Sequence, residues 1–282
     1  MIQLGLIGYP LGHSLSPKIH AAALEVCGLE GKYALFPIHP DDQQGLIDLL
    51  ARVHNGEITG LNVTIPHKQN VISRLDELTP TAKTIGAVNT ISMQNGRLTG
   101  DNTDVPGFLA DLKKFLALEK RKLGDIKTAL VLGAGGSARA VVYALVNDGW
   151  DVTVAARRAE QAAELVSQFQ ILNSRISSIE YHSTALDSLF PTVSLIVNTI
   201  PLGMSPNIDS SPWPDDLPFP SNAAVYDLVY NPRETKLVRD ARAAGILATT
   251  SLGMLIEQAA LAFEIWTGYS PPRNILNKAV VE

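Results

Sequence analysis

Short apolar runs alternate along the chain with longer stretches in which apolar residues recur every three or four positions, a pattern typical of α/β proteins. In the first third of the chain, the predicted strands are Leu4–Gly8, Tyr33–Ile38 and Leu61–Ile65. The predicted helices are about Pro17–Val26, Asp42–Val53 and Lys68–Leu75. Each strand is therefore followed by a helix, which is the repeating unit of a sheet covered by helices.

A predicted hairpin follows these units. Asn89–Met93 and Arg97–Thr99 have strand patterns, and Gln94-Asn95-Gly96 joins them, because Asn-Gly suits a tight turn. A helix is then predicted from about Val105 to Ala117, and it leads into a charged connector at Glu119–Lys122.

A second unit is predicted to begin at Lys127. Its first elements are strand Thr128–Leu132, helix Ser137–Asn147 and strand Asp151–Ala155, which together form a β–α–β run. The elements predicted after them are strands Leu195–Thr199, Ala224–Leu228 and Ile246–Thr249 and helix Met254–Trp266. Five prolines within Ser205–Pro220 predict an irregular surface loop.

The composition adds limits to this picture. The chain has 282 residues, 46% of them hydrophobic, which suggests about two domains with sizeable cores. The net charge of −5 argues against nucleic acid as a partner, and an anionic ligand would need a locally positive site. The sequence shows neither a signal-peptide pattern nor an apolar run of the length a membrane span needs. The one cysteine, Cys27, lies in an apolar run and is expected to be a packed residue of a cytoplasmic protein.

The turn after strand Thr128–Leu132 has the pattern of a dinucleotide-binding loop. Gly133-Ala134-Gly135-Gly136-Ser137-Ala138 fits G-x-G-x-x-G/A, directly after a strand and at the start of a helix. The first glycine permits the tight turn, the second lets the backbone approach a pyrophosphate, and the small Ala138 lets the helix pack on the sheet. The helix N-terminus would offer free N–H groups to the phosphates.

The end of the next strand indicates which nucleotide is bound. NAD-selective sites place an acidic residue there, on the ribose hydroxyls. This chain has Ala155-Ala156-Arg157-Arg158 instead, and arginines bind a 2′-phosphate with charge-assisted hydrogen bonds. The sequence therefore predicts NADP(H), with two solvated surface arginines as the alternative interpretation.

Four polar clusters fall at predicted strand ends in the first unit, where open α/β sheets bind ligands. They are GYPLGHSLSP, NVTIPHK, GAVNT and GDNTDVPG. Hydride transfer to a ketone builds negative charge on its oxygen, so a proton donor is needed close to it. A lysine such as Lys68, set next to a carboxylate, meets that need, and the hydroxyl and amide side chains suit a substrate rich in hydroxyl groups.

Single residues in these clusters also have structural alternatives. Ser16 precedes Pro17 and could N-cap a helix with proline in its first turn. Asp104 could likewise cap the helix that follows it. His13 and His67 are further candidates for a general base. The histidines and Cys27 show no spacing typical of a metal site, so none is expected.

Together the clusters resemble the signature motifs of shikimate dehydrogenases, in the same order along the chain. GYPLGHSLSPKIH, NVTIPHK, GAVNT and GDNTDVPG carry the resemblance first, and GAGGSARA, VNTIPLGM, YDLVYNP and SLGMLIEQ extend it to near the C-terminus. The resemblance implies the NADPH-dependent, reversible reduction of 3-dehydroshikimate to shikimate, a step of aromatic amino acid biosynthesis.

The resemblance also implies roles for individual residues. Lys68 and Asp104 would form the catalytic pair. The substrate residues would be Ser14 and Ser16 at the carboxylate, Tyr230 closing over it, and Thr64, Asn89 and Gln258 at the ring hydroxyls. The cofactor residues would be Gly133, Gly135, Gly136, Ser137, Ala138, Ala156, Arg157, Arg158, Asn198, Thr199, Met204 and Gly253.

The implied fold has two α/β domains. Residues 1–104 would form the substrate-binding and catalytic domain, and residues 105–253 a Rossmann domain for NADP. The C-terminal helices, about 254–282, would return to the first domain, and the active site would lie in the cleft between the domains. A small-molecule substrate and a monomer or homodimer are expected.

Two departures keep alternatives open. NADP-selective members resemble Asn-Arg-Thr where this chain has Ala156-Arg157-Arg158, so discrimination against NAD is expected to be weaker. Relatives that accept quinate often carry Thr in place of Ser16. The first alternative is therefore a dual-specificity quinate/shikimate dehydrogenase that also uses NAD. The others are a non-catalytic sensor of NADP(H) and a small acid, against which Lys68 and Asp104 count, and a folate-linked dehydrogenase of similar architecture.

Overall fold

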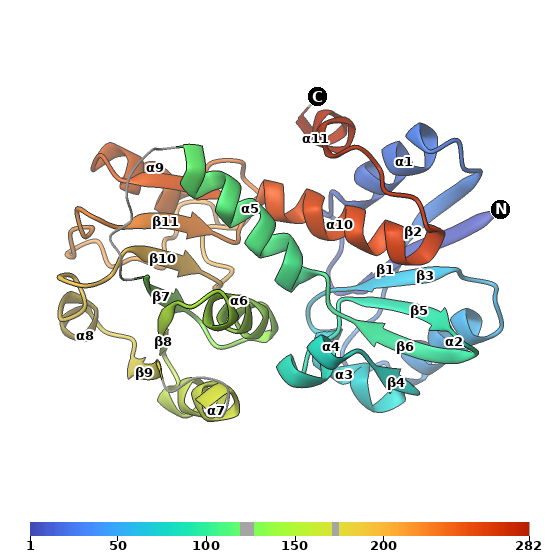
Figure 1. Cartoon of the computed structure of the whole chain (residues 1–282), viewed down its shortest axis with the longest axis horizontal. Helices are drawn as coiled ribbons and strands as arrows, with labels where there is room; N and C mark the ends of the chain where they lie inside the picture. The colour runs from blue at the N-terminus through green and yellow to red at the C-terminus, as the bar shows by residue number, and fades with distance from the viewer. Residues whose placement is uncertain (119–126, 171–174, 282) are drawn as a thin grey trace. The chain divides into compact units, whose positions relative to one another are not determined.

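The computed structural model describes residues 1–118, 127–170 and 175–281, and the chain divides into two compact units (Figure 1). Unit 1 consists of Met1–Gly107 with Leu255–Glu282, and unit 2 of Phe108–Met254. The sequence placed the boundaries after residues 104 and 253, and the structure has them after residues 107 and 254. Both boundaries fall inside helices, α5 (Asp104–Leu118) and α10 (Leu252–Thr267). The predicted charged connector, 119–122, lies outside the described residues.

The sheet of unit 1 has the strand order β2-β1-β3-β5-β6-β4. Its strands are β1 (Ile2–Gly8), β2 (Gly31–Pro37), β3 (Gly60–Val63), β4 (Glu77–Leu78), β5 (Thr90–Gln94) and β6 (Arg97–Asp101). β1 is parallel to β2 and β3, whereas β5 is antiparallel to β3 and β6. Asn95 and Gly96, between β5 and β6, have φ of 52° and 76°, as the predicted tight turn requires.

The helices of unit 1 lie between and after these strands. They are α1 (Ser16–Val26), α2 (Gln43–His54), α3 (His67–Asn70), a 3₁₀ turn at Ile72–Arg74, α4 (Pro80–Ile85), most of α10, and α11 (Arg273–Val281). The helix predicted over Lys68–Leu75 is thus two short pieces. α4 was not predicted, because its six residues are too few to show a periodic pattern.

The sheet of unit 2 is wholly parallel in its described part, with the order β12-β11-β10-β7-β8-β9. Its strands are β7 (Thr128–Leu132), β8 (Asp151–Ala156), β9 (Ile176–Glu180), β10 (Leu195–Asn198), β11 (Ala224–Asp227) and β12 (Leu247–Thr250). The chain builds outward from β7 to β9 and then returns to β10 on the other side of β7 (Figure 1). This is the doubly wound Rossmann order, which binds ligands where the order reverses.

Among the described residues, four helices connect the strands of unit 2. They are α6 (Gly136–Asn147), α7 (Ala159–Gln170), α8 (Ser183–Asp187) and α9 (Lys236–Ala243). α6 was predicted, whereas α7, α8 and α9, like strand β9, were not. None of the described helices has the length and apolar character needed to cross a membrane.

The proline-rich segment Ser205–Pro220 contains neither helix nor strand, as predicted, but it is not wholly at the surface. Trp213 is 5% exposed, and its indole N–H donates to the carbonyl oxygen of Leu217 at 2.9 Å. Its ring stacks on that of Phe219, with 5.2 Å between centroids. One buried aromatic side chain therefore anchors an otherwise irregular loop in the core of unit 2.

His20 of α1 is a fully buried histidine in the core of unit 1. Its ring stacks on Tyr33 with 4.3 Å between centroids and lies 5.4 Å from the ring of Trp266. Burial lowers the pKa of His20 from 6.5 to about 3, against a weaker opposing effect of Asn62. Between these two values, the unfolded chain binds a proton that the folded unit excludes, so falling pH favours unfolding.

We expect His20 alone to reduce the free energy of unfolding of unit 1 by about 1 kcal/mol for the step from about pH 6 to about pH 5. The His20→Phe variant keeps an aromatic ring but cannot bind the proton, so it should lack this loss. Urea unfolding followed by circular dichroism at each pH measures the free energy of unfolding of both proteins. An equal decrease with falling pH in the two proteins would show that His20 is not its cause.

Candidate active site

The sheet of unit 1 brings its polar clusters to one edge. β1 and β3 are parallel, so the segments that follow them leave at the same edge. β5 is antiparallel to β3 and starts at that edge, because Thr90 pairs with Asn62. β6 ends there, because its last residue, Asp101, pairs with Thr90. Asn89, before β5, and Asp104, after β6, are therefore at the edge where β1 and β3 end.

Lys68 and Asp104 form a largely buried ion pair at this edge. Lys68 Nζ lies 2.7 Å from Asp104 Oδ2, and the two side chains are 13% and 8% exposed. The backbone of Lys68 is also fixed, because its carbonyl oxygen accepts the N–H of Val88 at 2.8 Å. Away from water, each charge depends on the other for compensation. A paired ammonium and carboxylate that still reach a small opening can exchange a proton with a bound hydroxyl or ketone.

Asn89 is the centre of a buried hydrogen-bond network beside the pair. Its Oδ1 accepts the N–H of Thr103 at 2.7 Å and the hydroxyl of Thr90 at 3.0 Å. Its Nδ2 donates to Thr103 Oγ1 at 2.9 Å and to Gln258 Oε1 at 3.5 Å. Gln258 comes close because Gly107 has no side chain: a Cβ there would lie 2.9 Å from the Cβ of Gln258. The structure thus brings Asn89 and Gln258 together from distant parts of the sequence.

Ser14 and Ser16 lie together in the turn between β1 and α1. The N–H of Ser16 lies 3.3 Å from Ser14 Oγ, and Ser16 is 6% exposed. The alternative role of Ser16 as a helix cap is wrong, because Leu15 occupies the N-cap position of α1 and no side chain caps it. The Ser16 hydroxyl is therefore not used to satisfy the helix backbone.

The alternative role of Asp104 as a helix cap is also wrong. Asp104 is the first residue of α5, and its carboxylate binds Lys68. Asn102 performs the capping instead, because its Oδ1 accepts the N–H groups of Asp104 at 3.1 Å and of Val105 at 3.3 Å. This division leaves the Asp104 carboxylate available for the ion pair.

The other predicted substrate residues and the two candidate histidines each have a setting of their own within their unit. Thr64 directly follows β3, and a Cβ on Gly8 would lie 2.3 Å from its methyl carbon. Tyr230 belongs to unit 2, where it follows β11, and burial raises its pKa. His13 is exposed, whereas the buried His67 binds the carbonyl oxygen of Ile38 through Nε2 at 2.7 Å. In the part of the chain that is described, no three His, Cys, Asp or Glu side chains gather as a metal site.

The glycine-rich turn of unit 2 has the geometry of a phosphate-binding loop. Gly133 has φ of +106°, and a Cβ there would lie 2.5 Å from Thr199 Oγ1, so only glycine fits. Gly135 is the exposed N-cap of α6, and no side chain caps the helix. A Cβ on Gly135 would meet nothing within 4 Å. Gly136 and Ser137 open α6, and Ala138 is fully buried. An open, uncapped helix N-terminus fits the phosphates of a dinucleotide.

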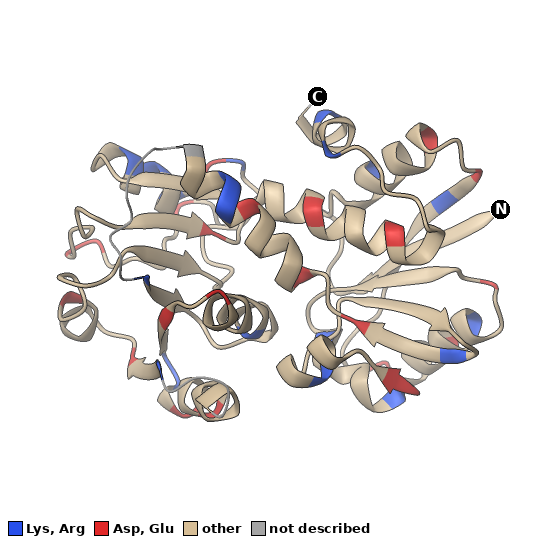
Figure 2. Ribbon diagram, viewed as in Figure 1, with Lys and Arg blue, Asp and Glu red and all other residues tan. Residues whose placement is uncertain are grey.

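Ala156 ends β8, and Arg157 and Arg158 follow it as exposed residues. Neither arginine side chain has an ion pair with any residue that the structure describes, so both remain available to an anion. Figure 2 shows Lys and Arg residues and Asp and Glu residues distributed over helices, strands and loops of both units. These two guanidinium groups place positive charge next to the end of β8 in a chain whose net charge is −5.

The carboxyl ends of β10 and β11 carry a buried polar network. Asn198 Nδ2 donates to Asp227 Oδ1 at 2.8 Å, and the hydroxyl of Thr235 donates to Asp227 Oδ2 at 2.6 Å. Burial raises the pKa of Asp227 to about 6, although these hydrogen bonds and one from Val229 oppose the shift. The side chain of Asn198 is fully buried, and its bond to Asp227 supports the ends of β10 and β11.

Three further predicted cofactor residues occupy different settings in unit 2. The Thr199 hydroxyl donates to the carbonyl oxygen of Leu132 at 2.6 Å, next to the glycine-rich turn. Met204 is 46% exposed. Gly253 lies against a carboxylate, because a Cβ there would be 1.9 Å from Asp111 Oδ1.

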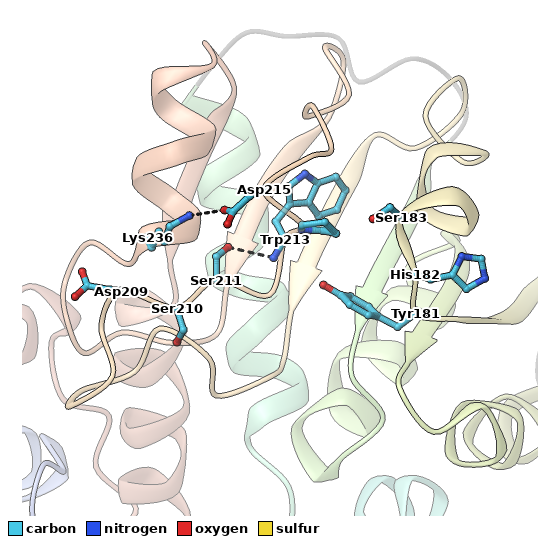
Figure 3. A pocket seen from close by; sticks show the side chains of 10 residues that line it. Tyr181, His182, Ser183, Asp209, Ser210, Ser211, Trp213, Asp215 and Lys236 are labelled. Atoms are coloured by element: carbon cyan, nitrogen blue, oxygen red, sulfur yellow. Dashed lines mark hydrogen bonds and ion pairs between the residues drawn. The ribbon is translucent and has the colours of Figure 1, made fainter.

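Unit 2 also has a cavity of about 570 Å³ that the sequence did not indicate (Figure 3). It lies between Tyr181–Ser183, the loop segment Asp209–Asp215, and Lys236. Lys236 Nζ is paired with Asp215 at 2.9 Å and with Asp240 at 2.8 Å, so its charge is already compensated. None of the predicted site residues lines this cavity.

Comparisons with known proteins identify the family of the chain. The shikimate dehydrogenase substrate binding domain matches residues 6–91, the shikimate / quinate 5-dehydrogenase family matches residues 116–196, and the shikimate 5'-dehydrogenase C-terminal domain matches residues 252–281. The shikimate dehydrogenase (NADP(+)) of Carboxydothermus hydrogenoformans is 41% identical over 280 residues, which are 98% of this chain and 95% of that protein. The chain belongs to the shikimate dehydrogenase family.

Solved structures of this family have the same fold. The shikimate 5-dehydrogenase of Thermus thermophilus, in complex with NADP(H) and shikimate, has a TM-score of 0.86 at 37% identity and covers 100% of this chain. That match includes 99% of the Thermus chain. The quinate dehydrogenase of Corynebacterium glutamicum, in complex with NAD, has a TM-score of 0.87 at 30% identity. It covers 99% of this chain and 98% of its own.

Sequence reasoning missed three polar residues that organise the shikimate dehydrogenase site. Thr103 and Asn102 are 3% and 2% exposed and bind Asn89 and the start of α5. Asn62 donates to the carbonyl oxygen of Asn89 at 3.3 Å and accepts the hydroxyl of Tyr33 at 2.8 Å. All three lie inside the motifs NVTIPHK and GDNTDVPG, so their positions were visible but their contacts were not.

Proposed function

We propose that the chain catalyses the reversible, NADPH-dependent reduction of 3-dehydroshikimate to shikimate. The observation that carries the proposal is the buried Lys68–Asp104 pair, which lies at the same sheet edge as the polar clusters of a shikimate dehydrogenase. The relatives at 41% identity are named as NADP(+)-dependent shikimate dehydrogenases, and the Thermus relative was solved with both ligands.

The Lys68–Asp104 pair would handle the proton of the reaction. NADP(H), when bound, supplies or accepts the hydride at the carbon that is reduced or oxidised. In the direction of reduction, the ketone oxygen gains negative charge, and the pair delivers a proton to it. In oxidation, the pair takes the proton from the hydroxyl. Because Lys68 Nζ and Asp104 Oδ2 are 2.7 Å apart, the two groups would act together as the proton donor in reduction and as the proton acceptor in oxidation.

The other unit 1 residues would bind and orient the substrate. Ser14 and Ser16 would hold its carboxylate, since the Ser16 hydroxyl is not used as a cap. Thr64, Asn89 and Gln258 would hydrogen-bond its ring hydroxyls, and the buried network fixes Asn89 for that purpose. Tyr230 would close over the carboxylate. A fixed array of donors and acceptors suits a rigid, polyhydroxylated ring.

Unit 2 would hold the cofactor. The uncapped N-terminus of α6 would bind the pyrophosphate, with Gly133, Gly135, Gly136 and Ser137 supplying close backbone approach. Arg157 and Arg158 would bind the 2′-phosphate, next to Ala156. Thr199, Met204 and Gly253 would lie along the nicotinamide half.

A second candidate function is a dual-specificity quinate/shikimate dehydrogenase that also uses NAD. The segment Ala156-Arg157-Arg158 favours it, because the chain lacks the amide and hydroxyl that the family resemblance implies for an NADP-selective site. A Listeria monocytogenes relative, 30% identical, was solved with shikimate and NAD, and the Corynebacterium relative is a quinate dehydrogenase solved with NAD.

The purified chain should oxidise shikimate with NADP fastest among the four pairs of shikimate or quinate with NADP or NAD. Absorbance of the reduced nicotinamide measures each rate. Comparable rates with quinate or NAD would favour the dual-specificity function. Absence of turnover with all four pairs, in folded protein that still binds NADP, would contradict both enzymatic functions.

Replacing Lys68 with alanine should lower turnover by roughly 10²- to 10⁴-fold and change the binding of shikimate little, because the ammonium acts mainly in the transition state. Steady-state kinetics and equilibrium titration measure the two effects. Lys83→Ala, an exposed lysine on α4, is the matched control and should keep full turnover. Survival of turnover in Lys68→Ala would refute the proton-exchange role.

The double variant Arg157→Ala, Arg158→Ala should raise KM for NADP by about tenfold or more while changing KM for NAD little, because only NADP carries the 2′-phosphate. Michaelis constants for the two cofactors, measured with shikimate, separate the effects. The variant Arg239→Ala removes an exposed arginine of α9 and serves as the control. Equal changes for NADP and NAD would remove the argument for the 2′-phosphate.

A further inference from the structure

Asn102 lies at a junction in unit 1 to which the proposed function assigns no role in catalysis. It is 2% exposed and lies between β6 and α5, two residues before Asp104. Its Oδ1 accepts the N–H groups of Asp104 at 3.1 Å and of Val105 at 3.3 Å. The amide oxygen therefore fixes the backbone from which the Asp104 carboxylate extends.

The amide nitrogen of Asn102 binds a different segment of the site. Asn102 Nδ2 donates to the carbonyl oxygen of Ala87 at 3.0 Å. The next residue, Val88, donates its N–H to the carbonyl oxygen of Lys68 at 2.8 Å, and Asn89 follows it. One side chain thus links the backbone of Asp104 to the segment that carries Asn89 and supports Lys68.

Asn102 is itself held in place. Its N–H donates to Asp101 Oδ1 at 2.7 Å, and the same oxygen accepts the Thr79 hydroxyl at 2.7 Å. The backbone N–H of Asn89 donates to the carbonyl oxygen of Asp101 at 3.0 Å. A buried amide with this many fixed partners has one orientation available to it. It can therefore fix the positions of the backbone groups it binds, in addition to stabilising the fold.

We propose that Asn102 is a positioning residue with two separable effects. Its amide oxygen sets the place of Asp104 against Lys68 and so supports turnover, whereas its amide N–H group sets the segment of Asn89 and so supports substrate binding. The inference rests on the proposed function, because it assigns both effects to the oxidation of shikimate with NADP.

Two substitutions separate the two ends of the amide. Serine caps helix N-termini about as well as asparagine, but its side chain is too short to reach the carbonyl oxygen of Ala87. Asn102→Ser should therefore keep kcat within about threefold of the wild type, since the cap is retained. Its KM for shikimate should rise about fivefold, the effect of one lost neutral hydrogen bond.

Asn102→Ala removes both ends and should behave differently. Its kcat should fall by about 10²-fold, because a misplacement of about 1 Å at a reacting group has effects of this size. Its KM for shikimate should rise as in Asn102→Ser. Restoration of kcat, but not of KM, by serine is the result that a merely structural role would not give.

The control variant removes a helix cap of unit 1 that is remote from the site. Asp42 caps α2 by accepting the N–H of Gly45 at 2.9 Å. Asp42→Ala should lower the thermal unfolding temperature as loss of a cap does, and it should leave kcat and KM unchanged. Thermal unfolding of every variant, with rates expressed per folded protein, separates stability from turnover.

Three results would overturn the proposal. The first is an equal kcat in Asn102→Ser and Asn102→Ala, and the second is a kcat in Asn102→Ala that matches Asp42→Ala. If Asn102→Ala does not fold, an unchanged KM in Asn102→Ser is the third. A wild-type chain without shikimate turnover would instead refute the proposed function, and the role of Asn102 would fall with it.

Discussion

The buried ion pair between Lys68 and Asp104 is the constraint on which unit 1 depends. Removing two charges from water costs several kcal/mol for each ion, and their attraction offsets this only when the geometry is fixed. The antiparallel hairpin of β5 and β6 brings Asp104 back to the edge where β3 delivers Lys68. The helix cap by Asn102 and the bond from Val88 then hold both backbones. Much of the polar structure around the site is thus what a stable buried pair requires.

The proposed cofactor site of unit 2 differs from the ion pair of unit 1, because it consists of backbone N–H groups and exposed charges. The N-terminus of α6 stays free of side-chain caps, and Arg157 and Arg158 stay exposed. At the carboxyl ends of β10 and β11, Asn198 and Thr235 bind the buried carboxyl group of Asp227 and make these strand ends rigid. An open surface that rests on a satisfied buried network can approach a large anion without rearranging.

The sequence predicted elements with strong local signals well, and it predicted side-chain direction poorly. Thr128–Leu132 has the same bounds in prediction and structure, and Asn95–Gly96 forms the expected turn. β9 was missed because Ser177 and Ser178 interrupt the apolar pattern of an edge strand. The family motifs indicated Lys68 and Asp104 as a pair, and the structure places their charged atoms 2.7 Å apart. Motifs could not show that the Asn198 side chain points into the core. It does so because the buried carboxyl group of Asp227, on a neighbouring strand, requires a hydrogen-bond donor.

Unit 1 consists of two segments that lie before and after unit 2 in the sequence, so it is the last unit to be completed during translation. A ribosome completes β1 to β6 first and then all of unit 2, before it adds the rest of α10 and α11. Gln258, which meets Asn89, is separated from it by 169 positions. A nascent chain can therefore finish its nucleotide-binding fold while the substrate-binding fold still waits for its last helices. Translation products that stop soon after Met254 would contain all of unit 2 but an incomplete unit 1.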